Sequence, residues 1–131
     1  MYIEKIKLQN FRNYKEQKIE LNPNINIFYG NNAQGKTNIL ESIFLCSFGK
    51  SFRTSKEKEM VCLGQENLQV EVAYQKSDRE GKIKITLATK KQIEVNRSKN
   101  KKIKWLSRKF KYCTFYSRWY WNIEKWTSSK T

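Results

Sequence analysis

The pattern G-x-x-x-x-G-K-[ST] at residues 30–37 constrains this chain more than any other feature. It stands between a short apolar segment, Ile25–Tyr29, and a segment in which apolar residues recur at helical spacing from Ile39 onward. Glycines at these positions let the loop turn several backbone N–H groups toward a common centre. The N-terminus of the following helix adds a partial positive charge there. The context therefore predicts a strand, an anion-binding loop and a helix, rather than a solvated Gly/Asn-rich turn.

The residue types in this loop indicate a site for the phosphates of a nucleotide. Lys36 is expected to reach the β- and γ-phosphates, and the Thr37 hydroxyl is expected to bind Mg²⁺. The other residues expected around the phosphates are Gly30, Asn31, Asn32, Ala33, Gln34 and Gly35. The expected cofactors are ATP and Mg²⁺. Asn38 follows the loop directly and is expected to be a helix-start residue rather than a ligand.

The hydrophobic pattern predicts an α/β protein with a P-loop NTPase core and an antiparallel β lobe. Strands alternate apolar and polar residues, whereas the helix after the loop repeats every three to four residues and meets a stop signal at Gly49. Ile25–Tyr29 is apolar on both faces, which is typical of a central strand covered on both sides. The expected strands are residues 2–11, 16–21, 25–29, 68–75, 82–89 and 92–96. The first two form a hairpin, and the last three form a meander.

Three stretches of sequence resemble the RecF family of SMC-like, ABC-type ATPases. They are "LQNFRNY", "FYGNNAQGKTNILESI" and "GKSFRT". SMC-type proteins usually carry a Gly-Ser pair in this loop, whereas "NAQGKTN" with the downstream "SFRT" is similar to RecF proteins. The resemblance covers about residues 1–106, and its specific motifs lie in the first 55 residues. We therefore expect residues 1–106 to be the N-terminal part of an ATPase head, with a P-loop core at 1–55 and the meander at 66–96.

The resemblance implies a function in DNA replication and repair. RecF-type heads dimerise around ATP, act at single-stranded gaps in DNA together with recombination mediator proteins, and take part in the SOS response. It also implies that Arg12 and Asn13 in "NFRNY" lie beside the nucleotide, although a solvated turn arginine is an equal alternative for Arg12. Arg53 in "SFRT" is a candidate for contact with DNA or with a dimer partner, and the simpler alternative is an exposed loop arginine.

Two elements that an ABC-type ATPase needs for hydrolysis do not occur in the sequence. No apolar strand ends in paired carboxylates that could hold Mg²⁺ and orient water, and no "LSGG"-like signature is present. The family's heads are also much longer than 131 residues. We therefore predict no catalytic residue here and expect an incomplete, hydrolysis-incompetent head.

The positive charge is concentrated near the C-terminus. Of the net +15, from 27 basic and 12 acidic residues, +10 comes from Arg97–Thr131, which holds 11 basic residues and one acid, Glu124. One interpretation is a stand-alone basic module that binds single-stranded nucleic acid through this tail, with cations on phosphates and aromatic rings on bases. Deleting Arg97–Thr131 would then abolish DNA binding.

A frameshift is the other interpretation of the tail, and it is the one that we prefer. Codons can be chosen for Lys111–Ser129 that, read one base later, encode a segment similar to the one that RecF proteins carry at this point. We expect residues 107–131 to be out of frame and disordered, a hypothesis that the coding DNA would test directly.

The remaining composition indicates a reducing environment. Cys46, Cys62 and Cys113 are odd in number and widely spaced, and there is no histidine, so neither a disulfide framework nor a zinc site is indicated. Cys46 is expected to be a buried core residue. No apolar run approaches the roughly 20 residues that cross a bilayer. We expect a cytoplasmic protein without a membrane partner.

Overall fold

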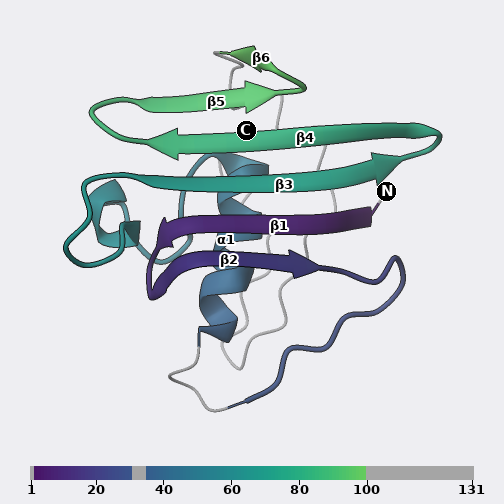
Figure 1. The fold of residues 1–131 in the computed structure, drawn as a ribbon, viewed down its shortest axis with the longest axis horizontal. Helices are drawn as coiled ribbons and strands as arrows, with labels where there is room; N and C mark the ends of the chain where they lie inside the picture. The colour runs from purple at the N-terminus through teal and green to yellow at the C-terminus, as the bar shows by residue number, and fades with distance from the viewer. Residues whose placement is uncertain (1, 31–34, 100–131) are drawn as a thin grey trace, which may run out of the picture.

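The computed structural model describes residues 2–30 and 35–99, which form one sheet with a helix against one of its faces (Figure 1). The expected out-of-frame segment at 107–131 and Cys113 lie outside the described residues, as does the alternative DNA-binding tail, Arg97–Thr131, apart from residues 97–99. The elements are β1 (Tyr2–Phe11), β2 (Tyr14–Glu20), α1 (Lys36–Phe48), the 3₁₀ helix η1 (Glu57–Met60), β3 (Leu68–Lys76), β4 (Arg79–Leu87), β5 (Lys91–Val95) and β6 (Ser98–Lys99).

The sheet has the strand order β2-β1-β3-β4-β5-β6, and every neighbouring pair is antiparallel. β1 pairs with β2 on one side and with β3 on the other, so the N-terminal hairpin and the later meander share one sheet. The register between β1 and β3 shifts between Ile3 and Lys5, next to the point where the consecutive apolar residues Tyr2 and Ile3 interrupt the alternation. The hairpin, the meander and the helix predicted from the sequence are confirmed.

The core lies between α1 and one face of the sheet. In β3 the side chains alternate, and Leu68, Val70, Val72 and Tyr74 are buried while their neighbours are partly exposed. Burying one Val, Leu or Ile side chain stabilises a fold by about 1.5–3 kcal/mol. The same alternation in β1, β4 and β5 gives the sheet an apolar face, and α1 covers it (Figure 1).

The helix is buried on most of its surface, not only along its apolar stripe. Cys46 is buried in it, as predicted, and the polar residues Glu41, Ser42 and Ser47 are buried as well. The helix ends at Gly49, whose left-handed φ of 72° lets its N–H donate to the Leu45 carbonyl at 2.7 Å. Within the described residues, no helix is long and apolar enough to cross a membrane.

The predicted central strand at Ile25–Tyr29 is wrong. The segment forms no strand, and Ile25, Ile27 and Tyr29 are exposed. Before this segment, the chain leaves the sheet after a backbone hydrogen bond from Leu21 N–H to the Glu4 carbonyl, 2.9 Å, and within the segment Phe28 is partly buried against the core.

Asparagine side chains turn the chain out of the sheet at this point. The Asn22 N–H donates to Asn26 Oδ1 at 2.7 Å, and the Asn24 N–H donates to Asn22 Oδ1 at 2.9 Å. Such local bonds satisfy backbone groups that a ladder would otherwise use. A strand also needs a neighbouring strand for its N–H and C=O groups, and none of the described strands lies beside this segment.

Gly81 in β4 gives a stability prediction. It lies opposite Tyr74, and a Cβ at Gly81 would come within 2.2 Å of the Tyr74 ring. The ring is buried and cannot move without loss of packing. We expect Gly81→Ala to lower the free energy of unfolding by about 1–3 kcal/mol, the usual cost of overpacking, measured by urea titration. The penalty should largely disappear in a Tyr74→Ala background, and an equal penalty in both backgrounds would contradict it.

Candidate nucleotide-binding site

The predicted phosphate loop is described at its two ends, Gly30 and Gly35–Thr37. Gly30 and Gly35 have φ values of 141° and 87°, a region that residues with a Cβ seldom adopt. The Lys36 ammonium group donates to the Gly30 carbonyl, so the lysine spans the loop from its end back to its start. Asn31, Asn32, Ala33 and Gln34 lie outside the described residues.

The N-terminus of α1 offers a suitable environment for an anion. The first intrahelical bond runs from the Ile39 N–H to the Gly35 carbonyl, 3.2 Å, so the N–H groups of the first turn point out of the helix. The first turn holds no acidic residue that would neutralise the helix dipole. Thr37 is exposed and Lys36 is half-buried. These features fit a phosphate group with a bound Mg²⁺, since Mg²⁺ in such sites takes few protein ligands besides the phosphates.

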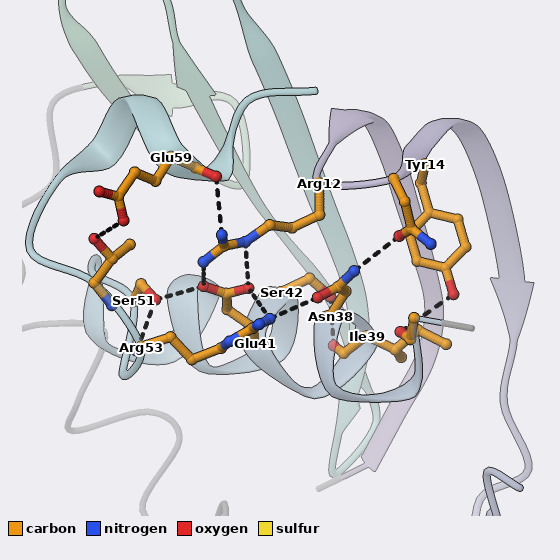
Figure 2. Close-up of polar contacts among 12 residues, drawn as sticks. Arg12, Tyr14, Asn38, Ile39, Glu41, Ser42, Ser51, Arg53 and Glu59 are labelled. Atoms are coloured by element: carbon orange, nitrogen blue, oxygen red, sulfur yellow. Dashed lines mark hydrogen bonds and ion pairs between the residues drawn. The ribbon is translucent and has the colours of Figure 1, made fainter. Parts of the chain in front are cut away.

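Tyr14 of β2 contacts the end of the phosphate loop at Gly35. Its hydroxyl donates to the Gly35 carbonyl at 3.2 Å (Figure 2). Burial raises the pKa of Tyr14 above the ordinary 10.0, so the phenol keeps the proton with which it donates. The ring lies so close to Gly35 that a Cβ there would come within 2.7 Å of the hydroxyl oxygen. Tyr14 thus fixes the backbone at the start of α1.

Arg12 occupies the turn between β1 and β2 and is held by a carboxylate. Its Nε donates to Glu41 Oε2 at 2.9 Å, and its Nη2 donates to Glu41 Oε1 at 2.7 Å (Figure 2). Its Nη1 donates to the Glu59 carbonyl at 2.9 Å. The side chain is only 18% exposed. The alternative of a solvated turn arginine therefore does not hold, and whether Arg12 also contacts a nucleotide stays a prediction.

Asn38 connects the two other predicted site residues. Its Nδ2 donates to Asn13 Oδ1 at 2.8 Å, and its Oδ1 accepts from Arg53 Nη1 at 2.6 Å. Asn13 belongs to the β1–β2 turn, and Arg53 belongs to the segment that follows α1. Residues predicted separately from "NFRNY" and "SFRT" therefore meet next to the end of the phosphate loop, in the arrangement that Figure 2 shows.

Glu41 is the site residue that the sequence analysis missed. Its side chain is fully buried, and besides Arg12 it accepts from Ser51 Oγ and, at 3.3 Å, from Arg53 Nη1. An acid in the middle of "NILESIF" was a usable signal, because a charged group among apolar residues is rarely buried without a partner. Glu41 lies beside the apolar stripe, where a solvated side chain is expected, so this signal alone does not identify its partners.

The segment after α1 is fixed by a second group of polar contacts. The Ser51 hydroxyl also accepts from the Arg53 N–H at 2.9 Å, and the Thr54 hydroxyl donates to Glu59 Oε2 at 2.6 Å. Two guanidinium groups thus contact one buried carboxylate, Glu41, while the Glu59 carboxylate accepts from Thr54 instead. In residues 2–30 and 35–99, no cluster of acidic or Cys side chains could hold a metal ion by itself.

Comparisons with known proteins agree on the relatives of this chain. A family model described as an AAA domain matches residues 5–125. The DNA replication and repair protein RecF of Clostridium tetani (strain Massachusetts / E88) is 51% identical over 98 residues, which are 73% of this chain and 27% of that protein. RecF of Clostridium botulinum (strain ATCC 19397 / Type A) is 50% identical over 105 residues, covering 79% of this chain and 29% of that protein.

Solved structures give the same result. A structure of the recombination mediator protein RecF with ATP, in the RecFOR pathway, matches with a TM-score of 0.73 and 42% identity over 78% of this chain and 28% of that chain. A structure from work on ATP-driven dimerization and DNA-stimulated activation of SMC ATPases matches with a TM-score of 0.74 at 21% identity, which shows the fold alone. The chain spans little more than a quarter of the length of the RecF relatives that it matches.

Proposed function

Because this chain belongs to the AAA-domain family and is similar to the N-terminal part of RecF proteins, we propose that it binds ATP at Gly30–Thr37. The observation that carries the proposal is the start of α1, where a left-handed Gly35 precedes an exposed Thr37 and an acid-free first turn. Lys36 pairs with the β- and γ-phosphates, and backbone N–H groups of the loop and helix bind the same oxygens. The Thr37 hydroxyl is the ligand to Mg²⁺, which neutralises phosphate charge when it is bound.

Arg12 and Asn13, in the β1–β2 turn, are the proposed nucleotide contacts outside the phosphate loop. Three of the five N–H donors of a guanidinium group are used by Arg12 in its bonds to Glu41 and Glu59. The remaining N–H groups, one on Nη1 and one on Nη2, are held in a fixed orientation by these bonds, and we propose that they donate to a phosphate oxygen. Asn13 is fixed by Asn38, which sits one residue after Thr37.

The proposed role is that of a RecF-type protein of DNA replication and repair in the cytoplasm. The relatives named RecF support it, as does the RecF structure described as a recombination mediator. Under this proposal the DNA partner is single-stranded or gapped, the protein partners are recombination mediators, the pathway includes recombinational repair and the SOS response, and the intact head forms a homodimer. Arg53, whose side chain is 39% exposed, is the proposed DNA contact.

Hydrolysis is not part of the proposal for these 131 residues. In phosphoryl transfer a carboxylate holds the metal ion and helps to position water, and the sequence provides neither that element nor the signature motif. We propose that the chain binds ATP without hydrolysing it at the rate of intact heads of this family.

Lys36→Ala tests the proposed site. Losing a charge-assisted bond to phosphate costs about 1.5–3 kcal/mol, so we expect the Kd for Mg-ATP to rise by about ten- to hundredfold, measured by isothermal titration calorimetry on the full chain. Lys90→Ala is the matched control, because Lys90 is an exposed lysine between β4 and β5 and its loss changes the net charge equally. Equal Kd values for the two variants would contradict the assignment, as would a wild-type chain that binds no ATP.

A further inference from the structure

Glu41 lies at the point where three separate segments meet. It belongs to α1, Arg12 belongs to the β1–β2 turn, and Ser51 and Arg53 belong to the segment after the helix. Both carboxylate oxygens accept hydrogen bonds. Oε1 accepts from Arg12 Nη2 and from the Ser51 hydroxyl, and Oε2 accepts from Arg12 Nε and from Arg53 Nη1. Figure 2 shows both arginines directed at this one carboxylate from different sides. No other described glutamate is fully buried.

The geometry of these bonds defines the direction of the guanidinium groups. A bidentate pair with both Nε and Nη2 fixes the plane of a guanidinium group, which a single contact does not. The Arg12 plane is further set by the bond from Nη1 to the Glu59 carbonyl. Arg53 is fixed at two points, Asn38 and Glu41. Without the carboxylate, two neighbouring guanidinium groups would repel each other and separate.

We propose that Glu41 is a positioning residue for the nucleotide site, which holds Arg12 and Arg53 together beside the first turn of α1 so that their charge favours a triphosphate over a diphosphate. The inference rests on the proposed ATP site and adds how that site selects its ligand. Among the charged groups that contact one another here, two guanidinium groups meet one carboxylate, so this cluster carries one net positive charge. It lies at the same end of the helix as Lys36 and the N–H groups of the first turn. The interaction of this charge with a ligand increases with each further phosphate.

The experiment compares ATP and ADP binding in Glu41→Gln and in wild type. Glutamine has nearly the same shape but no charge, so it weakens the bonds that orient both arginines without opening a cavity. It also raises the net positive charge by one, so a rise in ATP preference would show that net charge, and not the positioning of the arginines, determines selectivity, and would overturn the inference. We expect the Kd for ADP divided by the Kd for ATP to fall by about tenfold, measured by calorimetry on the full chain. No further fall is expected when Glu41→Gln is added to a variant that lacks both arginines, Arg12→Ala with Arg53→Ala. Glu71→Gln is the matched control, because Glu71 pairs with Lys7 and Lys82 on the other face of the sheet.

A second variant and a second measurement separate positioning from general loss of structure. Arg12→Lys keeps the charge but cannot form the bidentate pair, and it should lower the same ratio. In ¹⁵N NMR the Arg12 Nε–H signal should exchange slowly with water in wild type and rapidly in Glu41→Gln. The inference would be overturned by a loss of affinity that is equal for ATP and ADP, or by a further fall of the ratio when Glu41→Gln is added to Arg12→Ala with Arg53→Ala.

Failure of the proposed function gives a different result. If wild type binds neither ATP nor ADP, the nucleotide site itself is wrong, and the selectivity assigned to Glu41 is wrong with it. If wild type prefers ATP and Glu41→Gln retains the full preference and the slow Arg12 signal, the nucleotide site stands and only the role of Glu41 is refuted.

Discussion

Glu41→Ala is expected to lower the free energy of unfolding by about 3–5 kcal/mol, the cost of removing one partner from a buried ion pair. The variant leaves Arg12, whose side chain is 18% exposed, without the carboxylate that accepts two of its hydrogen bonds. It also removes the acceptor for Ser51 and Arg53. Because small domains are stable by only about 5–15 kcal/mol, this is a large fraction of the total. Urea denaturation followed by circular dichroism measures it.

Glu71→Ala is the control that separates burial from ion pairing. Glu71 also has two cationic partners, with Lys7 at 3.7 Å and Lys82 at 3.5 Å, but its own side chain is 17% exposed, against 0% for Glu41, and the two lysines are 50% and 61% exposed. Exposed pairs contribute at most about 1 kcal/mol, so we expect a loss no larger than that. Similar losses for the two variants would show that the burial of Glu41 does not determine its contribution. Arg12→Met combined with Glu41→Leu should recover part of the loss, because Arg12, the more buried of the two arginines that pair with Glu41, no longer remains as an unpaired charge.

Gly35→Ala is expected to destabilise the start of α1 and to abolish ATP binding. The φ of 87° is strained for alanine, at about 1–2 kcal/mol, and the new Cβ would lie 2.7 Å from the Tyr14 hydroxyl oxygen and 2.9 Å from the ring carbon that carries it. Relieving the clash moves either the Tyr14 ring or the loop, at about 1–3 kcal/mol. Since the loop's N–H groups must converge on one phosphate, we expect the Kd for ATP to rise at least about hundredfold.

Gly64→Ala isolates the backbone part of this effect. Gly64 has nearly the same φ, 82°, but a Cβ there would meet nothing within 4 Å. We expect the free energy of unfolding to fall only by the cost of a left-handed alanine, and the ATP affinity to equal that of the wild type. Tyr14→Ala in the Gly35→Ala background should restore the clash part of the stability. If Gly35→Ala and Gly64→Ala have the same unfolding free energy and the same Kd, the contact with Tyr14 is not what makes glycine necessary.

The local elements could be predicted because their signals are contained in short stretches. The strict alternation in "LQVEVAYQ" and "KIKITLAT" gave β3 and β4, because period-two burial requires only one apolar face to pack against. The helix was predicted with its end, because Gly49 supplies the left-handed cap that terminates it. The proposed division into a P-loop core and a separate meander remains a prediction, although β1 and β3 pair within one sheet.

The strand predicted at Ile25–Tyr29 failed because strands depend on neighbours. Its apolar residues gave the right local signal, but a β-ladder forms only where another strand offers unpaired N–H and C=O groups. The asparagines at positions 22, 24 and 26 bond among themselves and turn the chain away from the sheet. Residues 22–24 read "NPN", a sequence typical of a turn, but a turn signal does not show whether the next residues return to the sheet.

The candidate site was predicted in part. Arg12, Asn13 and Arg53 were chosen from two motifs about 40 positions apart, and the structure brings all three to the start of α1. Their neighbour Glu41 was missed, because its burial depends on segments that approach α1 from both ends of the sequence. A pattern along one helix does not show which polar residue will be covered by another part of the chain.

The sequence by itself determined the nature of each part: alternating strands, a glycine-bent loop before a helix, and a lysine and a threonine placed for phosphate and Mg²⁺. These follow from backbone conformation and side-chain chemistry, which act over a few residues. Only the tertiary structure decided which parts meet. It excluded Ile25–Tyr29 from the sheet, buried Glu41 and directed two distant arginines at it, because hydrogen bonding and desolvation of a charge depend on groups that are near in space rather than in sequence.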